Sequence, residues 1–450
     1  MFSRLKPPLR RLLAWTQKYV RTDMAYLVKN GALSGLNFFV TSVLGLAVAV
    51  AAANLLDKET YGIYRYALSL VGLASSLSLT GMNTAVARAV ARGEDGILRY
   101  AVRKQFAWNT LSTLAMISAA AYFYFRGNAL LAFSMLILGV TLPPTWALNT
   151  YTAFLAGKKD FKTATRYSLI NTALYSAAMA ATMYAFRSVT GLIIVYGLSN
   201  LLLTAYFYVR TLRRYRPGEA SAEASGDVWG YGKHLTAINI MSLVAQQCDS
   251  IVVFHYVGPA RLAIYTFANL MPDRIKKFAK NISSTISPKI ATKDTESLTR
   301  SLYFRFFQAA CAGLAAALAY IIVAPFIFRW LFPQYLDALF YSQIIALNLT
   351  FPVPITYGAY VVQGQKMIRP LYISNSVSSV FRIASIIAGG YFWGVSGVIY
   401  AKLIGNGIVA VGGMLFLHSE LVRINATHRP VAELDAFVPE TEPPTASTDV

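Results

Sequence analysis

The most constraining feature of the sequence is a pair of long apolar segments near its start. Residues Ala32–Leu56 contain no charged side chain, and residues Tyr61–Ala87 contain only Arg65. A short polar turn, Asp57–Thr60, separates the two segments. An apolar helix of about 20 residues is long enough to cross the hydrocarbon of a bilayer, where a helix satisfies its own backbone hydrogen bonds. The chain is therefore predicted to begin as a membrane hairpin.

The hairpin returns in the second half of the sequence. Matching positions in register are Gly31 with Gly232, Tyr64 with Tyr265, Ala67 with Ala268, Thr84 with Thr285 and Arg88 with Lys289. The ends of the two halves also match, because residues 189–193 resemble residues 395–399. Several matches at a nearly constant offset indicate an internal duplication, a pattern typical of secondary transporters.

The composition is that of a membrane protein. Hydrophobic residues make up 56% of the 450 residues, and charged residues make up only 14%. With a positive mean hydropathy, this balance exceeds what soluble globular proteins show, so a large soluble helical protein is rejected. Cys248 and Cys311 both lie in apolar segments. They form no disulfide framework and indicate neither metal binding nor catalysis.

Basic residues alternate along the chain and account for the formal net charge of +21. They fill every second connection: the N-terminal arm and the segments Arg88–Lys104, Lys158–Arg166, Arg210–Arg216, Lys289–Arg300, Lys366–Arg369 and Arg423–Arg429. The connections between these segments contain few basic residues. By the positive-inside rule, both termini are predicted to be cytoplasmic, with an even number of spans. The positive charge is therefore explained by the orientation of the protein in the membrane, and no nucleic acid partner is predicted.

The sequence predicts an all-α integral membrane protein with about 12 transmembrane helices in two six-helix repeats. Apolar residues at helical spacing in the N-terminal arm, a Pro-Gly pair near the middle and an acidic, proline-rich end set the boundaries. We predict a cytoplasmic amphipathic arm at 1–26, an N-terminal six-helix bundle at 27–212, a cytoplasmic linker at 213–228, a C-terminal six-helix bundle at 229–421 and a disordered cytoplasmic tail at 422–450.

Motifs of enzymes are missing from the sequence. It contains no glycine-rich phosphate loop, no His-Glu-x-x-His, no Cys-x-x-Cys and no nucleophile elbow. A membrane polysaccharide polymerase or ligase would need surface carboxylates and a sizeable outer loop, whereas the predicted outer connections are short. We therefore predict a transporter that is not an enzyme, with no cofactor and no metal. A polymerase or ligase stays as the second alternative.

Ionisable side chains inside the predicted spans are the candidate site, because each costs roughly 2.5–3.5 kcal/mol to insert. The candidates for substrate binding are Arg382, Lys402, Arg274, Arg65, Lys29 and Arg305. Arg382 and Lys402 lie deepest, which favours a place in a cavity. The others have structural alternatives. Lys29 and Arg305 would snorkel to the cytoplasmic interface, and Arg65 would reach the outer headgroups.

Acidic residues inside the spans are fewer. Asp249 is the only plausible residue for coupling transport to an ion, and Asp273 is next to Arg274. Structural pairing remains an alternative for both acids. The excess of basic groups favours a large anionic substrate group, such as a pyrophosphate, over an organic cation. Asparagines along the spans suit either sugar hydroxyls or interhelical contacts: Asn30, Asn37, Asn83, Asn200 and Asn406.

A family resemblance is carried by the runs Asn54–Asp57 and Tyr61–Leu70 and by their counterparts, Gln247–Val252 and Ala263–Ala268. Over residues 27–420, the chain resembles the polysaccharide-export, O-antigen type flippases of the multidrug/oligosaccharidyl-lipid/polysaccharide superfamily. The resemblance implies a MATE-like, V-shaped transporter with a central cationic cavity. It also implies a substrate, undecaprenyl-pyrophosphate-linked oligosaccharide, that is moved to the outer leaflet for surface polysaccharides such as O-antigen or exopolysaccharide.

We therefore predict a lipid-linked oligosaccharide flippase that works by alternating access in the cytoplasmic (inner) membrane. The first alternative is a cation-coupled multidrug or small-molecule exporter of the same fold. The drug-extruding branch commonly has an acidic residue in an early helix, and the first span here has none. Expected partners are the lipid-linked substrate, membrane lipids, a polysaccharide polymerase and glycosyltransferases. The protein itself is expected to be a monomer.

Overall fold

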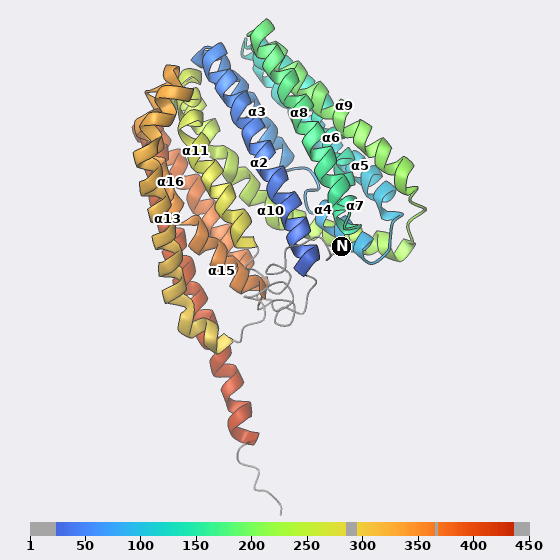
Figure 1. Cartoon of the computed structure of the whole chain (residues 1–450), viewed down its shortest axis with the longest axis vertical. Coiled ribbons are helices and arrows are strands. Elements are labelled where there is room, and N and C mark those ends of the chain that lie inside the picture. Colours follow the sequence, from blue (N-terminus) through green and yellow to red (C-terminus); the bar gives the residue numbers. More distant parts are fainter. Residues whose placement is uncertain (1–23, 285–294, 365–367, 436–450) are drawn as a thin grey trace, which may run out of the picture. The chain divides into compact units, whose positions relative to one another are not determined.

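The computed structural model describes residues 24–284, 295–364 and 368–435 (Figure 1). Within these ranges the chain is helical and contains no strand. The predicted all-α fold class is therefore confirmed. The α-helices are α2 (Met24–Leu55), α3 (Lys58–Ser75), α4 (Met82–Ala91), α5 (Ile97–Phe125), α6 (Ala129–Leu148), α7 (Thr150–Gly157), α8 (Phe161–Ala185), α9 (Val189–Tyr215), α10 (Ala222–Val257), α11 (Pro259–Ser284), α13 (Thr295–Leu331), α14 (Ala338–Ala346), α15 (Pro352–Gly364) and α16 (Ile368–Asp435).

Several helices of the described residues follow one another with only a short break. α3 continues into α4 and α6 into α7, and α14 and α15 are joined by the short 3-10 helix η3 (Leu347–Thr350). α16 consists of two helical segments, because Gly394 interrupts it with φ 59° and ψ −135°. A residue with a side chain rarely adopts this backbone conformation. Gly394 therefore allows the chain to turn between the last two spans.

The helices differ in how apolar they are. Seven segments of the described residues are long and apolar enough to cross a membrane, including those of α2, α9, α10 and α13. α3, α8 and α11 are absent from this group. α11 contains Asp273, Arg274 and Lys276 within one turn. Such helices stay in a membrane only where their polar faces pack against protein or line a polar space.

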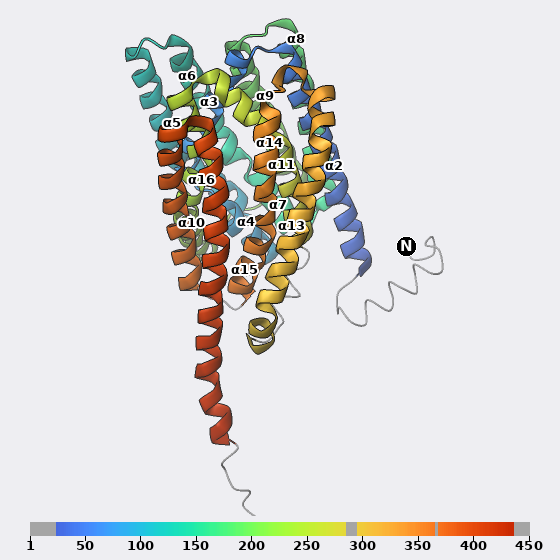
Figure 2. The same ribbon diagram turned by 90° about the vertical axis from the view of Figure 1, so that its left-hand side faces the viewer.

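The chain divides into two compact units. The larger unit includes the chain up to Ala268 together with residues 325–341 and 386–398, and the smaller unit consists of residues 269–324, 342–385 and 399–450. This division follows spatial contacts and differs from the two predicted repeats in sequence, which stay a prediction. In the smaller unit, α13, α15 and the second part of α16 run side by side (Figure 2).

The first turns of α10 pack against α4 in the larger unit. A buried stripe at every fourth residue, Ala224, Val228, Gly232 and Thr236, faces α4. The backbone N–H of Gly81 donates a hydrogen bond to Thr236 Oγ1 at 3.0 Å. A Cβ atom on Gly81 would lie only 2.5 Å from the carbonyl oxygen of Gly232. The helices therefore approach backbone to backbone, as small residues permit in membranes.

The predicted connecting segments differ from the structure in two places. α9 ends at Tyr215 and α10 begins at Ala222, so the break inside the predicted linker is shorter than expected. α16 continues to Asp435, so residues 422–435 are helical where the sequence analysis predicts disorder. A long helix needs few apolar residues once an apolar span has nucleated it. The predicted N-terminal arm up to residue 23 and the end of the tail lie outside the described residues.

Candidate functional site

One side of α11 forms a polar stripe in the smaller unit. Asn269, Asp273, Lys276 and Lys280 follow one another at intervals of four, three and four residues. Because an α-helix has about 3.6 residues per turn, these four side chains lie on the same face. A stripe of this kind on a membrane helix indicates a polar surface inside the protein.

Basic residues from α16 join this stripe. Lys402 Nζ donates a hydrogen bond to Asn269 Oδ1 at 3.1 Å. Lys276 interacts electrostatically with Lys402, Asp273, Arg382 and Lys280. We refer to Lys276, Lys280, Arg382 and Lys402 as the basic cluster. Among the described residues, Lys276 thus interacts with three cations and one carboxylate, so the cluster has a positive excess that an anion would balance.

Arg382 contributes a guanidinium group to the basic cluster. Its side chain is half-buried, and its Nε atom is buried without a hydrogen-bond partner among the described residues. A buried donor without a partner costs about 1–3 kcal/mol. A phosphate or carboxylate oxygen would satisfy the planar fork of the guanidinium. The predicted residues Arg382 and Lys402 are thus brought into one cluster.

An amide pair lies one turn further along α16. Asn406 Nδ2 donates a hydrogen bond to Asn348 Oδ1 at 3.0 Å. The Nδ2 atom of Asn348 is buried and has no partner in the part of the chain that the structure describes. Asn406 was among the predicted polar groups. Its observed partner lies on another helical segment, so Asn406 makes an interhelical contact in this structure.

The other predicted cations have different surroundings. Arg274 is two residues from Lys276, which places it about 160° away around α11. Arg305 is exposed on α13 and lies within electrostatic range of Tyr357 on α15. Lys29 belongs to α2, but its side chain lies outside the described residues. The role of Arg274, Arg305 and Lys29 in substrate binding therefore stays a prediction.

Arg65 is surrounded by tyrosines in the larger unit. Tyr61 and Tyr64 of α3, Tyr175 of α8 and Tyr196 of α9 all interact electrostatically with it. The ring of Tyr196 is 6.4 Å from that of Tyr64 and 6.0 Å from that of Tyr175, both edge to face. Arg65 Nε is buried without a hydrogen-bond partner among the described residues. We call these five residues the Arg65–tyrosine cluster.

Asp249 is buried in the larger unit, with 6% of its surface exposed. Its Oδ2 atom accepts a hydrogen bond from the buried hydroxyl of Tyr265 at 2.8 Å. Its Oδ1 atom accepts one from the backbone N–H of Ser250, also at 2.8 Å. A carboxylate held this way is protected from solvent and changes its contacts when it binds a proton. No group of three or more potential metal ligands occurs among the described residues.

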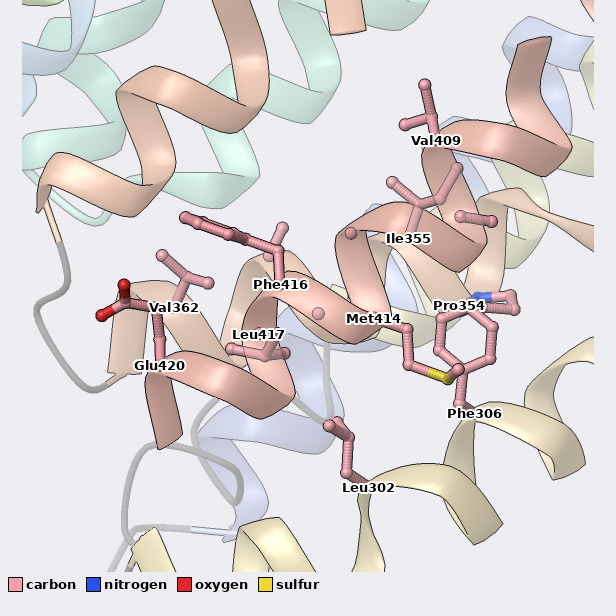
Figure 3. Close-up of a pocket in the computed structure, with 14 residues that line it drawn as sticks. Leu302, Phe306, Pro354, Ile355, Val362, Val409, Met414, Phe416, Leu417 and Glu420 are labelled. Atoms are coloured by element: carbon pink, nitrogen blue, oxygen red, sulfur yellow. The ribbon is translucent and has the colours of Figure 1, made fainter. Parts of the chain in front are cut away.

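An apolar cavity of about 90 Å³ lies in the smaller unit (Figure 3). Leu302 and Phe306 of α13, Ile355 of α15 and Met414 of α16 line it, and Glu420 lies at one end. The Glu420 carboxylate is 3.6 Å from the Arg423 guanidinium. This lining suits hydrocarbon and offers no cation to a phosphate. The cavity is therefore distinct in chemistry from the basic cluster.

Comparison with known proteins places the chain in a family. Residues 52–310, more than half of the chain, match the family described as Polysaccharide biosynthesis protein. The chain belongs to this family. No curated protein matches this polysaccharide biosynthesis protein, so the family assignment rests on that match.

Solved structures show which fold this polysaccharide biosynthesis protein has. An inward-facing multidrug resistance MATE transporter of the MOP superfamily is 17% identical over 86% of this chain and 96% of its own, with a TM-score of 0.65. The lipid II flippase MurJ, in an inward closed conformation, is 15% identical over 86% of this chain and 87% of its own, with a TM-score of 0.63. A MOP superfamily transporter from Pyrococcus furiosus, 15% identical over 88% and 94%, has a TM-score of 0.52. The predicted MATE-like fold is confirmed.

Sequence reasoning missed several residues of this polysaccharide biosynthesis protein. Lys276 is not among the predicted cations, although its spacing from Asn269 and Asp273 places it on their face of the helix. The partners Asn348, Tyr175 and Tyr196 lie on other helices. No pattern in a single sequence pairs residues across helices, so only the structure identifies them.

Proposed function

We propose that this protein is a flippase that moves an undecaprenyl-pyrophosphate-linked oligosaccharide across the cytoplasmic membrane by alternating access. The observation that carries the proposal is the basic cluster on α11 and α16, which combines four cations with one carboxylate. Membership of a polysaccharide biosynthesis family and the MOP fold support it. An anionic group on a lipid-linked glycan is the substrate chemistry that suits all three observations.

The basic cluster suits a pyrophosphate for electrostatic reasons. A pyrophosphate carries more than one negative charge, so several cations are needed to balance it where water is scarce. Arg382 would bind phosphate oxygens through two parallel N–H groups, whereas Lys276 and Lys402 would act as point charges. An organic cation would be repelled by the same residues. This is the reason to prefer the flippase over the multidrug exporter.

The Arg65–tyrosine cluster is suited to the sugar part of such a substrate. Aromatic rings offer flat apolar faces, and tyrosine hydroxyls donate and accept hydrogen bonds. Tyr64 and Tyr175 interact electrostatically with each other, so their hydroxyls lie in one region of this cluster. We propose that sugar hydroxyls or a sugar carboxylate bind here, next to the Arg65 guanidinium.

Alternating access requires contacts that open and close. In the larger unit, Lys58 at the start of α3 forms an ion pair with Asp337, the residue before α14, at 2.9 Å. By the positive-inside rule, the turn that contains Lys58 is predicted to face outward. Gly62 lies directly against Pro259, since a Cβ atom on Gly62 would be 1.9 Å from the Pro259 carbonyl oxygen. The rings of Tyr66 and Phe254 stack at 3.6 Å. We propose that these contacts form the outer gate and separate when substrate is released.

Asp249 is the proposed coupling residue. A carboxylate buried with the Tyr265 hydroxyl would gain or lose a proton or a cation as its surroundings change during transport. A cation-coupled exporter of the same fold would use the same residue, so Asp249 alone does not separate the two functions. The remaining expectations are also proposals: a monomer in the inner membrane, with both termini cytoplasmic and with polymerase and glycosyltransferase partners.

The proposal is tested by surface polysaccharide in a strain that lacks the gene and carries a variant copy. The double variant Arg382→Ala/Lys402→Ala is expected to abolish surface polymer while the protein level stays normal. Lys159→Ala/Lys162→Ala is the matched control, because both lysines are exposed in a basic connection, and it is expected to retain polymer. Normal polymer in the first variant would discard the basic cluster as the substrate site.

A second experiment separates the flippase from the exporter. Drug susceptibility is measured in the same strains, with the wild-type gene present or absent. A flippase is expected to change surface polymer and leave drug susceptibility unchanged, whereas an exporter would change susceptibility only. For coupling, Asp249→Asn is compared with Asp227→Asn, a variant of an exposed acid outside the basic cluster. Retained transport in Asp249→Asn would remove that residue from the coupling mechanism.

A further inference from the structure

Two lysines lie over one tryptophan near the start of α10. Lys233 Nζ is 5.0 Å from the Trp229 ring centroid, and Lys104 Nζ, from α5, is 5.5 Å from it. Trp108, also on α5, packs edge to face against Trp229 at 5.9 Å. Lys104 is in addition 5.7 Å from the ring of Tyr100. We call Lys104, Lys233, Trp229 and Trp108 the lysine–tryptophan patch.

The two lysines of this patch carry unbalanced charge. Other basic residues nearby form ion pairs, such as Lys158 with Asp95 and Arg92 with Asp227. Neither Lys104 nor Lys233 has a carboxylate within ion-pair distance among the described residues. The face of an indole attracts an ammonium group, which brings both lysines to one place. Two like charges held together favour an anion that contacts both.

The patch has an apolar border on α5. Trp108 and Leu111 are exposed large hydrophobic residues one and two turns from Lys104, on the same face of α5. The Trp108 Nε1–H donates a hydrogen bond to the Leu77 carbonyl oxygen at 2.9 Å, which fixes the indole in place. Tryptophans and lysines combined in this way are typical of the level of lipid headgroups. The border suits acyl chains, and the lysines suit a phosphate.

The patch is built on a rigid part of the larger unit. The buried stripe of α10 from Ala224 to Thr236 packs against the core around α4 and α5. Trp229 and Lys233 follow one another at four residues, so they project from one side of that stripe. The two lysines are therefore positioned by packed helices and not by a loop.

We propose that the lysine–tryptophan patch binds the phosphate headgroup of an anionic phospholipid. The positive-inside distribution puts this patch in the cytoplasmic leaflet, where anionic lipids and basic side chains meet. The ammonium groups of Lys104 and Lys233 contact the phosphate oxygens, and the apolar border on α5 contacts the acyl chains. The bound lipid joins α5 to α10, the first helix of the second half. The inference does not depend on the proposed transport function.

The test uses the purified full-length protein in detergent, titrated with phosphatidylglycerol or phosphatidylcholine and followed by native mass spectrometry. Lys104→Gln/Lys233→Gln is expected to bind phosphatidylglycerol at least about tenfold more weakly than the wild type. Lys159→Gln/Lys162→Gln removes the same charge from another basic connection and is expected to bind as the wild type does. Phosphatidylcholine binding is expected to be weak in all three proteins.

Three results would overturn the proposal. Equal loss in both double variants would mean that binding follows overall charge and not this patch. Unchanged binding in Lys104→Gln/Lys233→Gln would exclude the two lysines. Full competition by inorganic phosphate at the lipid's concentration would assign the patch to free phosphate. If the double variant is not monodisperse, Lys233→Gln alone gives the same comparison against Lys162→Gln, with a loss of about threefold or more expected.

Discussion

Lys402 on α16 donates a hydrogen bond to Asn269 on α11 over 3.1 Å, which fixes an ammonium group at the start of the polar stripe. Lys276 lies seven residues along the same face of α11 and is within electrostatic range of Lys402. Two ammonium groups are thus kept near each other in a membrane helix bundle, where repulsion between them is weakly screened. Negative charge bound between them would offset this repulsion.

The first prediction concerns Lys276. Lys276→Gln is expected to lower surface polymer production at least about tenfold, because a charge-assisted contact to the substrate is worth about 1.5–3 kcal/mol. Lys159→Gln is the control, since Lys159 is exposed in the connection before α8 and lies outside the stripe. It is expected to leave polymer production within about twofold of the wild type. An equal loss in both variants would mean that the stripe has no special role.

The transmembrane segments were predictable from the sequence, whereas their grouping was not. A span such as α2 is defined by the hydrocarbon thickness alone, and its residues carry that information locally. The two compact units depend on which helices pack together, which is decided by shape and close approach, as at Gly81 and Gly232. These contacts join residues far apart in the sequence. For this reason the repeats can be predicted from the sequence, whereas the units cannot.

The candidate site was predictable only in part, and for the same reason. Arg382 and Lys402 could be identified from their depth in apolar segments, since depth follows from position along the chain. The same criterion also selected Arg274, which lies on the opposite side of α11 from Lys276. Depth says nothing about direction around a helix axis. Direction follows from the 3.6-residue period, and combining the two criteria would have identified Lys276.

The second prediction concerns the Arg65–tyrosine cluster. Arg65→Lys keeps the charge but removes the planar fork, and is expected to lower polymer production about tenfold if the guanidinium binds the substrate bidentately. Arg126→Lys is the control, because Arg126 also lies over a tyrosine, Tyr122, at 5.5 Å, but is exposed. It is expected to behave as the wild type. Full activity of Arg65→Lys would show that only the charge matters there.

The third prediction is a dependence of stability on pH at Asp160, in the connection between α7 and α8. Partial burial alone would raise the pKa of this carboxyl, but hydrogen bonds from Tyr215 and Thr163 outweigh it. The Arg214 guanidinium, 3.2 Å away, acts in the same direction. The pKa of Asp160 is therefore held below its ordinary value. The carboxylate form is the one that stabilises the folded protein.

The direction of the pKa shift of Asp160 decides in which pH range the stability of the protein changes. Because the folded-state pKa lies below the unfolded value of about 3.9, the stabilisation is present above about pH 4 and is lost as the pH falls through the folded-state pKa. The Tm difference between the wild type and Asp160→Asn is expected to be constant from about pH 7 to 5 and to shrink below about pH 4. Asp227→Asn is the control, since its ion pair with Arg92 is exposed and 3.8 Å long and contributes little.

The last prediction concerns the close contact between Gly62 and Pro259. A side chain at position 62 would place its Cβ atom 1.9 Å from the Pro259 carbonyl oxygen, so Gly62→Ala must separate α3 from the start of α11. The neighbouring ion pair between Lys58 and Asp337 would then be pulled apart. Crosslinking of a Lys58→Cys/Asp337→Cys protein, made after Cys248→Ser and Cys311→Ser, is expected to fall at least about threefold when Gly62→Ala is added. Gly35→Ala, where a Cβ meets nothing within 4 Å, is expected to leave crosslinking unchanged, and equal crosslinking in both would exclude this contact as part of the gate.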